Sequence, residues 1–421
     1  MPALVARLSG LNMWTLCTVL ILIVFKRLAT IWTRNRSNTV QHRNSVFHDL
    51  VKSIPWKKFD ALVAQHGADK HVRRLPTKSQ LIALLYGQFS GASSLREIVD
   101  GLESHSSRLY HIGARPVQRS TFADANALRP SAVFTDLLSA MLLQVQRGLR
   151  RTIGEAVYLI DSTSLPLSGK GSEWAHFSHM ACGAKAHMIY DAQAECPLYV
   201  EVTAAKVNDI TVAQTMPIEA GATYVFDLGY YDYGWWARMD QAGCRIVTRL
   251  KRNTPLRVSA ELAVPEGGVI LSDRIGVLPA RLATNRKNPF SDPVREIMVK
   301  IETGKVLRIV SNDLDASAQA IADLYKRRWA IELFFRWVKQ TLKIHRFLGK
   351  SENAVRIQIA VALIAYLLLR IAQMAQKAVQ TPLAFVRLVR ANLMHKKRID
   401  RLIGHDPTPD KHANQMVLQW N

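Results

Sequence analysis

Hydrophobic positions between residues 45 and 150 recur three and four apart, which is the period of an amphipathic helix. The period is clearest in four segments, SVFHDLVKSI, WKKFDALVAQ, KSQLIALLYGQF and SSLREIVDGL. Thr77, Ser93 and Ser120 stand near the predicted helix starts, where a side-chain oxygen satisfies a free backbone N–H. We therefore expect a helical N-terminal domain over residues 44–150, with these three residues as caps.

The pattern changes after residue 150, where short apolar runs begin to alternate with polar turns. EAVYLID is an apolar run that ends in Asp161, and ATYVFD is another that ends in Asp227. The segment KAHMIYDAQAECPLYVEVTA predicts a hairpin, CRIVTRL a further strand, and DITVAQTM and YDYGWWARMDQAG predict helices. Residues 151–249 are thus expected to form an α/β layer.

The next segment, residues 250–312, lacks a helical period. It contains four strand candidates, LRVSAEL, GVILSD, REIMVKIE and KVLRIVS, which are separated by Gly, Pro and Asn. Short strands between such turn residues are typical of a β-rich segment, so we expect an insertion made of strands here.

Helical periodicity returns over residues 313–395. One helix is expected from about Ser317 to residue 346, and Ser351 caps a second helix that carries VRIQIAVALIAYLLLRIAQ. Gln358 interrupts this apolar run, which favours a buried core helix over a membrane span. Residues 396–421 follow as a basic C-terminal tail.

An apolar run near the start of the chain, residues 11–25, allows two interpretations. Its sequence, LNMWTLCTVLILIVF, is followed by Lys26 and Arg27, as in a membrane anchor. The run is shorter than the roughly 20 residues that span a bilayer, however. The globular pattern begins only near SVFHDLVKSIPW, so we favour a misplaced start, with Val40 marking an alternative one, and expect residues 1–43 to be non-globular or spurious.

The charge balance points to a polyanionic partner. The 421 residues include 56 Lys and Arg against 33 Asp and Glu, a formal net charge of +23, while the 48% hydrophobic content is that of a globular chain. Such a charge attracts nucleic acid. The four cysteines are scattered without a C-x2-C pair, which argues against a zinc site or disulfide framework and fits the reducing cytoplasm.

A first candidate for a DNA contact lies in GARPVQRSTFADANALR. A Gly/Pro turn precedes a short predicted helix, with Arg115 and Arg119 at or before its N-terminus. Helix N-termini bind phosphates, and paired short helices enter DNA grooves. The alternative is a helix pair that only packs against its neighbours.

Acids at strand ends are the candidates for catalysis. A single Asp there is often a turn or cap residue. Asp161 and Asp227 each follow an apolar strand, however, and strand ends in α/β sheets collect ligands. With a third carboxylate they would hold two divalent ions roughly 3.5–4 Å apart, which clamp the oxygens of a phosphoryl transfer. Magnesium prefers such oxygen ligands.

The stretch LYKRRWAIELFFRWVKQ, residues 324–340, supplies the third acid among five basic side chains. At about 100° per helical residue, six side chains share an arc of about 100°. These are Tyr325, Arg328, Trp329, Glu332, Arg336 and Lys339. A core-facing stripe would be aliphatic, and a solvated face would not need aligned aromatics. The face suits a metal-binding Glu332 between cations that contact phosphates and an aromatic that stacks on a base.

These residues carry a resemblance to a known family. Tyr325, Arg328, Glu332 and Lys339 match Y-x2-R-x3-E-x6-K, and the chain resembles the DDE transposases of the bacterial insertion-sequence-four family. Asp161 in YLIDSTSL and Asp227 in VFDLGYYDY look like the two aspartates of that family. The likeness covers about residues 45–395 and leaves residues 1–43 outside.

The resemblance implies an α/β fold with an RNase H-like core, interrupted by the β-rich insertion and preceded by the helical domain. It implies that Asp161, Asp227 and Glu332 bind two Mg²⁺ ions, with Mn²⁺ as a substitute. Tyr325, Arg328 and Lys339 would contact transposon-end DNA, and Trp329 resembles a stacking tryptophan. A second base-flipping aromatic is not assigned, because residues 250–312 offer Phe290 but no Trp.

The expected function is therefore transposition. The protein would bind double-stranded ends of an insertion sequence as a homodimer, cleave them and join the freed 3′ hydroxyl to target DNA. It would do so in the bacterial cytoplasm, at the nucleoid, without a required protein partner. The alternatives are a metal-dependent nuclease without strand transfer, an inactive DNA-binding remnant, and a membrane-anchored protein.

Overall fold

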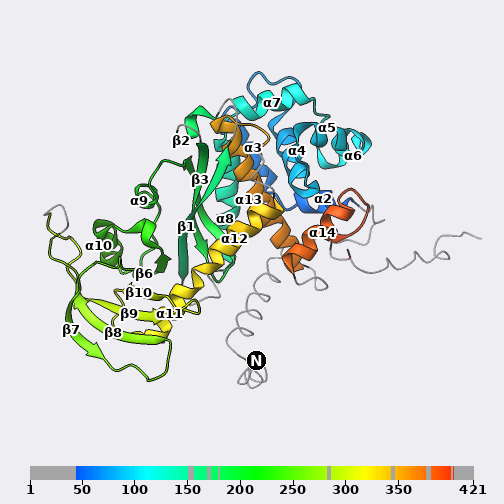
Figure 1. Cartoon of the computed structure of the whole chain (residues 1–421). Coiled ribbons are helices and arrows are strands. Elements are labelled where there is room, and N and C mark those ends of the chain that lie inside the picture. Colours follow the sequence, from blue (N-terminus) through cyan, green and yellow to red (C-terminus); the bar gives the residue numbers. More distant parts are fainter. Residues whose placement is uncertain are drawn as a thin grey trace, which may run out of the picture.

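The structure is a computed structural model with a ten-stranded mixed sheet and helices on both of its faces (Figure 1). It describes residues 44–149, 156–167, 172–178, 181–281, 286–342, 347–375, 381–399 and 402. The expectations for residues 1–43, including the apolar run at 11–25, and for nearly all of the basic tail lie outside the described residues.

The first part of the described chain is helical, as its periodicity predicts. Its elements are α2 (Val46–Val51), α3 (Trp56–Gln65), α4 (Thr77–Ser90), α5 (Leu95–Glu103), α6 (Ser106–Leu109), the 3-10 helix η2 (Tyr110–Ile112), α7 (Arg119–Leu128) and α8 (Ala132–Leu149). All four segments with the clearest period are helices; three bury one side, whereas α4 is buried on nearly all sides.

Three predicted caps are displaced. Pro76 is the N-cap of α4, and Thr77 is its first residue; the Thr77 amide and hydroxyl donate to Asp69 Oδ1 at 2.8 and 2.6 Å. Ser120 lies inside α7, whose N-cap is Gln118. A proline at the cap position leaves the helix without a side-chain acceptor of its own, so a distant acid satisfies the free amide.

The cap of α5 is Ser94 rather than Ser93. The Ser94 hydroxyl accepts from the Glu97 amide at 3.2 Å, while the Ser93 amide donates to the Glu97 carboxylate at 2.8 Å. This reciprocal pairing resembles a capping box, with the acid three residues after the cap. The error of one residue arose because adjacent serines present the same signal.

The sheet contains β1 (Val157–Leu167), β2 (His176–Ser178), β3 (Ala181–Asp191), β4 (Cys196–Ala204), β5 (Thr223–Phe226), β6 (Arg245–Arg249), β7 (Arg257–Leu262), β8 (Ile270–Val277), β9 (Val294–Lys300) and β10 (Val306–Ser311). Its order is β2-β3-β1-β5-β6-β10-β9-β8-β7. The tenth strand, β4, also pairs with β3, along residues 184–191. The pairs β1–β5 and β5–β6 are parallel and the others antiparallel. The four strands predicted after residue 250 therefore form, and β10 joins them to β6.

Side chains alternate between two cores along each central strand, because successive residues of a strand face opposite sides. On β1, Val157 and Leu159 belong to one core, and Tyr158 and Ile160 to the other. The first core is largely aliphatic and includes α2–α8. It also includes α11 (Ala318–Arg327), α12 (Trp329–Thr341), α13 (Glu352–Ala375) and α14 (Pro382–Asn392).

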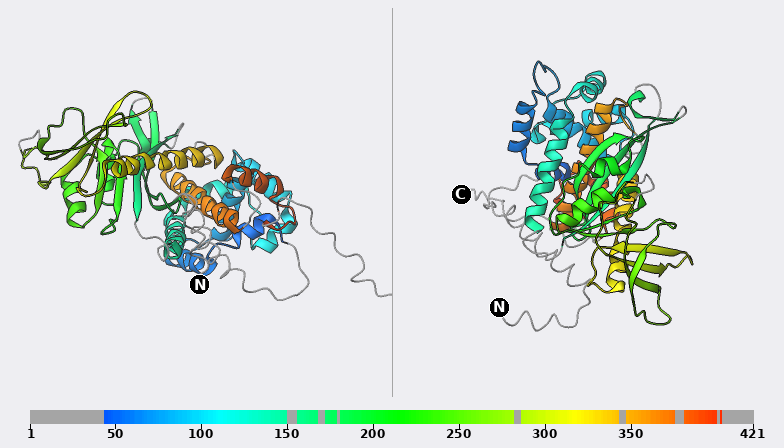
Figure 2. Two further views of the ribbon diagram at one scale, coloured as in Figure 1. Left: turned by 90° about the horizontal axis from the view of Figure 1, so that it is seen from below. Right: turned by 90° about the vertical axis from the view of Figure 1, so that its left-hand side faces the viewer.

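The second core is rich in aromatic side chains and lies under α9 (Asp209–Ala213) and α10 (Tyr233–Gln241). Trp235 and Trp236 of α10 are each 1% exposed, and both pack on Phe226 of β5. Figure 2 shows the sheet between these two groups of helices. Two short 3-10 helices, η3 (Glu173–Ala175) and η4 (Leu228–Tyr230), complete the elements.

Of the two helices predicted after residue 313, the second forms as expected and the first is divided in two. Within the described chain, α13 is the one helix long and apolar enough to cross a membrane, but 83% of its most apolar window is buried, as expected of a core helix. The Ser351 hydroxyl accepts from the Ala354 amide at 3.3 Å, as predicted for its cap. The single helix expected from Ser317 is wrong: Arg328 separates α11 from α12.

The two ends of the described chain meet. The amides of Val46 and Phe47 donate to the carbonyls of His395 and Leu393 at 3.1 and 2.8 Å. Helix α13 packs against α4, α7 and α8, so the last helices share one core with the first.

Candidate active site

Asp161 and Asp227 occupy equivalent positions on neighbouring parallel strands. The parallel pairing of β1 with β5 runs from Val157 opposite Thr223 to Ile160 opposite Phe226, and the two aspartates are the next residues. Asp227 follows β5 and caps η4, with its Oδ1 accepting from the Gly229 amide at 2.8 Å. The adjacency follows directly from the register.

The prediction that Asp161 ends its strand is wrong. β1 continues to Leu167, because its pairing with β3 extends from Tyr158 opposite Asp191 to Leu167 opposite Cys182. Asp161 therefore sits at the point where β1 loses its parallel neighbour but keeps its antiparallel one. That opening beside β5 leaves room for other groups to approach the Asp161 carboxylate.

Glu332 reaches the same place from α12, which packs on β1. Arg328 links the acids: its Nη2 lies 2.6 Å from Glu332 Oε1, and its Nη1 lies 3.5 Å from Asp161 Oδ2. The sheet and the helix therefore bring all three predicted acids into one neighbourhood, across 171 residues of sequence.

The charges of the other two acids act on Asp161. Burial raises the pKa of Asp161 to about 6, against the effect of the Ser162 amide that donates to it. The charges of Asp227 and Glu332 raise this pKa further, while Arg328 lowers it. Among the described residues, Arg328 forms ion pairs with Asp161 and Glu332, and no ion pair reaches Asp227.

The donor set suits divalent ions, although no three acid, imidazole or thiol groups among the described residues surround a single point closely enough to bind one. Magnesium in phosphoryl-transfer sites takes only one or two carboxylates, with water and phosphate as the remaining ligands. Two carboxylates per ion are available here if Asp161 is paired once with Asp227 and once with Glu332. The Arg328 guanidinium, which contacts both Asp161 and Glu332, stands where a cation between those two carboxylates would be.

The predicted basic face is divided between core and solvent. Tyr325 is only 7% exposed, and the Arg328 guanidinium lies over its ring at 5.7 Å from the centroid. Trp329 is 54% exposed and Arg336 is also exposed, while Lys339 is half-buried and burial lowers its pKa. Tyr325 therefore supports Arg328, and Trp329 and Arg336 face the solvent.

Arg115 and Arg119 are exposed on a different part of the molecule, at the start of α7. The Arg115 amide donates to the Ser79 hydroxyl of α4 at 3.0 Å, so the turn before α7 is fixed to the helical region. The structure does not bring these two arginines into contact with the three acids; it presents them as a separate basic position.

Sequence reasoning missed two residues beside the acids. Arg249 ends β6, the strand next to β5, and its charge lowers the pKa of Tyr325. Asp209 begins α9 and contacts residues of β1 and β3. A basic residue at the end of CRIVTRL was a readable signal for Arg249, whereas Asp209 looked like an ordinary first-turn acid.

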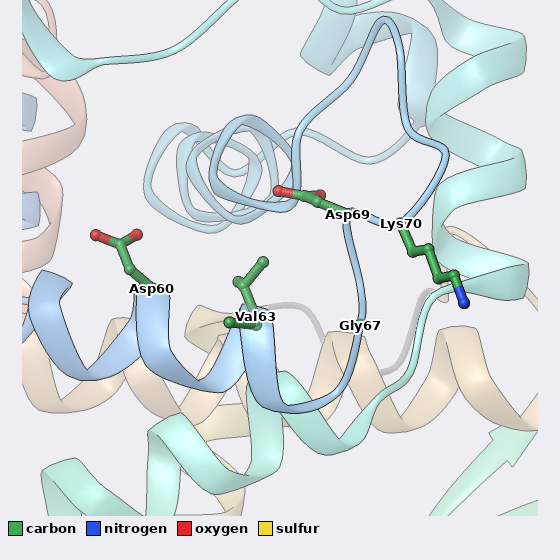
Figure 3. A pocket seen from close by; sticks show the side chains of 6 residues that line it. Asp60, Val63, Gly67, Asp69 and Lys70 are labelled. Atoms are coloured by element: carbon green, nitrogen blue, oxygen red, sulfur yellow. The ribbon is translucent and has the colours of Figure 1, made fainter.

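A hollow of about 410 Å³ lies elsewhere, at the end of α3 (Figure 3). Its lining includes Asp60, Gly67, Asp69 and Lys70. Asp69 accepts both hydrogen bonds from Thr77 and thus stabilises the start of α4. The hollow is a feature of the helical region and contains none of the three acids.

Comparison with known families covers most of the chain. Residues 153–368 match the family model of the transposase DDE domain, and residues 42–115 match Domain of unknown function (DUF4372). The first match spans slightly more than half of the chain and contains Asp161, Asp227 and Glu332.

Individual relatives agree with the family match. A putative transposase of Sinorhizobium fredii is 40% identical over 71% of this chain and 83% of its own length. A probable transposase for an insertion sequence element of Geobacillus stearothermophilus is 29% identical over 62% and 69%. A solved piggyBac transposase synaptic complex with hairpin DNA aligns over 85% of this chain and 82% of its own, at 11% identity and a TM-score of 0.41. On the family match and the first of these relatives, the chain belongs to the DDE transposases of insertion sequences.

Proposed function

We propose that this transposase binds the ends of an insertion sequence, cleaves them and joins them to target DNA, with Asp161, Asp227 and Glu332 as its catalytic acids. The observation that carries the proposal is the convergence of the three acids on one side of the sheet. Two arrive on adjacent parallel strands, and the third on a helix where Arg328 connects it to Asp161.

The division of labour follows the fold. Residues 151–249 and 313–395 form an RNase H-like core, supported by antiparallel β4–β3–β1 joined to parallel β1–β5–β6. Residues 250–312 are an insertion that extends the sheet from β6, and residues 44–150 are a helical DNA-binding domain. Residues 1–43 and 396–421 lie outside these units.

Asp161 with Asp227, and Asp161 with Glu332, would hold two magnesium ions, for which manganese can substitute. Bound there, the ions neutralise charge on the scissile phosphate and polarise it for attack. The protein contributes fixed positions: the strand register sets Asp161 beside Asp227, and α12 sets Glu332. Arg328 balances the acids before DNA arrives and is then next to the phosphate.

DNA contacts surround this centre. Arg336 and Lys339 neutralise phosphates along α12, and exposed Trp329 stacks on a base. Phe290 does not supply a second stacking ring, because it is 3% exposed and packs edge-on against Trp236. Arg115 and Arg119 contact the end DNA at a second position, and a homodimer holds both ends in the nucleoid.

The test uses the full chain and a plasmid that carries the inverted repeats flanking the gene. Wild type is compared with D161N, D227N and E332Q, with Asp100→Asn on the exposed side of α5 as the control of equal charge. We expect the control to cleave normally, and the three variants to bind ends but not cleave them. Cleavage by E332Q at the wild-type rate contradicts the assignment.

A second assay separates a transposase from a nuclease that only cuts. Pre-cleaved ends with free 3′ hydroxyls are incubated with a target plasmid and Mg²⁺ or Mn²⁺. Covalent joining of ends to the plasmid, absent in D161N, supports strand transfer. Cleavage without joining, under conditions where the ends are bound, supports the nuclease alternative.

A further inference from the structure

Asp209 connects three elements behind the proposed catalytic acids. The Ser162 hydroxyl of β1 donates to its Oδ1 at 2.8 Å. From β3, Lys185 Nζ lies 3.1 Å from the same oxygen and also donates to the Val207 carbonyl at 3.1 Å. His187, with a fully buried side chain, places Nδ1 3.4 Å away. These contacts hold a half-buried carboxylate in one position.

The contacts lie on the opposite face of the sheet from Asp161. Ser162 is the next residue on β1, so its side chain points away from that of Asp161. The Ser162 amide donates to Asp161 Oδ1 at 2.8 Å. Whatever fixes Ser162 therefore fixes the donor that orients the Asp161 carboxylate.

Asp209 also adjoins the second catalytic strand. A Cβ added to Gly229 would lie 3.0 Å from Asp227 Oδ1 and 3.4 Å from Asp209 Oδ2, so the two carboxylates flank the same glycine. The loop after β5 is thereby confined between them. Only a residue without a side chain fits this position unless Asp227 shifts by a few tenths of an ångström.

A buried hydroxyl marks the space between these groups. Tyr230 is fully buried, and its hydroxyl lies beside the Ser162 side chain. Its surroundings are Ser162 and the carboxylates of Asp209, Asp161 and Asp227. Ser162, Asp209 and the two proposed catalytic aspartates therefore lie around one buried hydroxyl and form a single polar centre.

We propose that Asp209 is a positioning residue of the active site. It acts through Ser162 on Asp161 and through Gly229 on Asp227, and it keeps the two acids at the spacing that the divalent ions and the phosphate require. The inference rests on the proposed function. Because Lys185 pairs with Asp209, D209N also leaves the Lys185 charge unbalanced, whereas S162A changes no charge and tests the placement of the acids alone.

Asp191 provides a matched structural control. It lies at the other end of β3, and its Oδ1 accepts from the amides of Gln193 and Ala194, each at 2.8 Å. It stabilises the turn to β4, on the same strand as Lys185 and His187. D191N should therefore lower the melting temperature without changing how the folded protein binds metal or cleaves DNA.

The experiment compares D209N, S162A and the double variant, as full chains. Displacing a reacting group by about 1 Å lowers a rate by up to about 100-fold, so we expect kcat for end cleavage to fall roughly 10- to 100-fold in D209N. S162A should lose about 10-fold, and the double variant no more than D209N, because linked residues are not additive. End-DNA affinity in EDTA should stay within about twofold, since neither residue is a phosphate contact.

A second readout does not depend on activity. Mn²⁺ binding to the DNA-free protein, followed by electron paramagnetic resonance, should weaken about 10-fold in D209N and S162A, as when a residue supporting metal ligands is removed. D191N should match wild type. S162A removes a single hydroxyl, so it carries the test alone if D209N does not fold.

The outcomes are distinct. Wild-type kcat and Mn²⁺ affinity in S162A, or additive losses in the double variant, overturn the positioning role. If D161N still cleaves, the proposed function itself fails. If D161N is inactive while folded D209N is fully active, only the role of Asp209 is lost.

Discussion

Two clusters of acids at the sheet, one buried and one partly exposed, differ in how their charges are balanced. In the segment after residue 250, fully buried Glu296 lies between Arg274 and Arg308, at 2.6 and 2.5 Å. Nearby, both oxygens of Asp273 accept from Arg295, at 2.8 and 2.6 Å. There, three guanidiniums serve two acids, and every carboxylate is paired within the protein.

At the other cluster the ratio is reversed. Among the described residues, Arg328 forms ion pairs with two of the three acids, Asp161 and Glu332, and Asp227 forms no ion pair. A buried carboxylate that is paired with an arginine needs no further cation. Carboxylates that outnumber their paired arginines can bind an external cation. The difference separates an acid that holds the fold from one that is available for chemistry.

The largest effect expected is on cleavage. D161N should reduce end cleavage by at least about 10⁴-fold, because it removes a ligand shared by both proposed ions. The metal-free protein should become more stable by about 1–2 kcal/mol, because burial and its acidic neighbours raise the pKa of Asp161 and so disfavour its charged form. Plasmid cleavage and urea unfolding in EDTA measure both. Lost cleavage with lost stability would place Asp161 among the structural acids.

The opposite behaviour is expected at the balanced cluster. E296A removes the carboxylate that Arg274 and Arg308 share and should destabilise the protein by about 3–5 kcal/mol. Cleavage per folded molecule should be unchanged, since Glu296 lies on β9 rather than among the three acids. Urea unfolding gives the first quantity, and cleavage normalised to the folded fraction gives the second. A specific loss of cleavage would remove the distinction between the clusters.

Removing Arg328, the cation that Asp161 and Glu332 share, tests whether these acids can bind an external cation instead. R328A should destabilise the metal-free protein by about 1–3 kcal/mol, because Asp161 and Glu332 lose a charged partner. Mg²⁺ should then raise the melting temperature of R328A more than that of wild type. Thermal unfolding in EDTA and in Mg²⁺ measures the difference, and equal shifts in both proteins would argue against an ion site at these acids.

The smallest effect concerns exposed charge. R336A should lower the slope of log affinity for end DNA against log salt by about 0.9, the change expected when one phosphate contact is lost. R257A, at an exposed position on β7, is the control and should leave the slope unchanged. Mobility-shift titrations at several salt concentrations give the slopes. Equal slopes for both variants would move the DNA path away from α12.

Local patterns predicted the elements well, and the missing features depend on distant pairing. Apolar periods gave the helices of the first region and the strands of the insertion. That β1 continues beyond Asp161 follows from its partner β3, which no local window contains. The break at Arg328 was missed because the helical angles were counted as if residues 324–340 formed one helix. The backbone angles of Arg328 are themselves nearly helical.

The candidate site shows the same limit. The signature spacing identified Glu332 and its basic neighbours, and strand ends identified Asp161 and Asp227. Tyr325 looked like a surface aromatic, but packing places it in the core beneath Arg328. Asp209 gave no separate signal, because an acid at a helix start is common and its partners Ser162 and Lys185 lie on distant strands.

The hydrogen bonds of Val46 and Phe47 with His395 and Leu393 have a consequence for folding during synthesis on the ribosome. Chains emerge N-terminus first, at about 5–20 residues per second, and regions that fold as units do so once all their parts have emerged. The first described helix, α2, can form these hydrogen bonds only after the residues that follow α14 have been synthesised. A premature stop ahead of α14 would therefore expose the beginning of the protein to proteases and aggregation, although its own codons are intact.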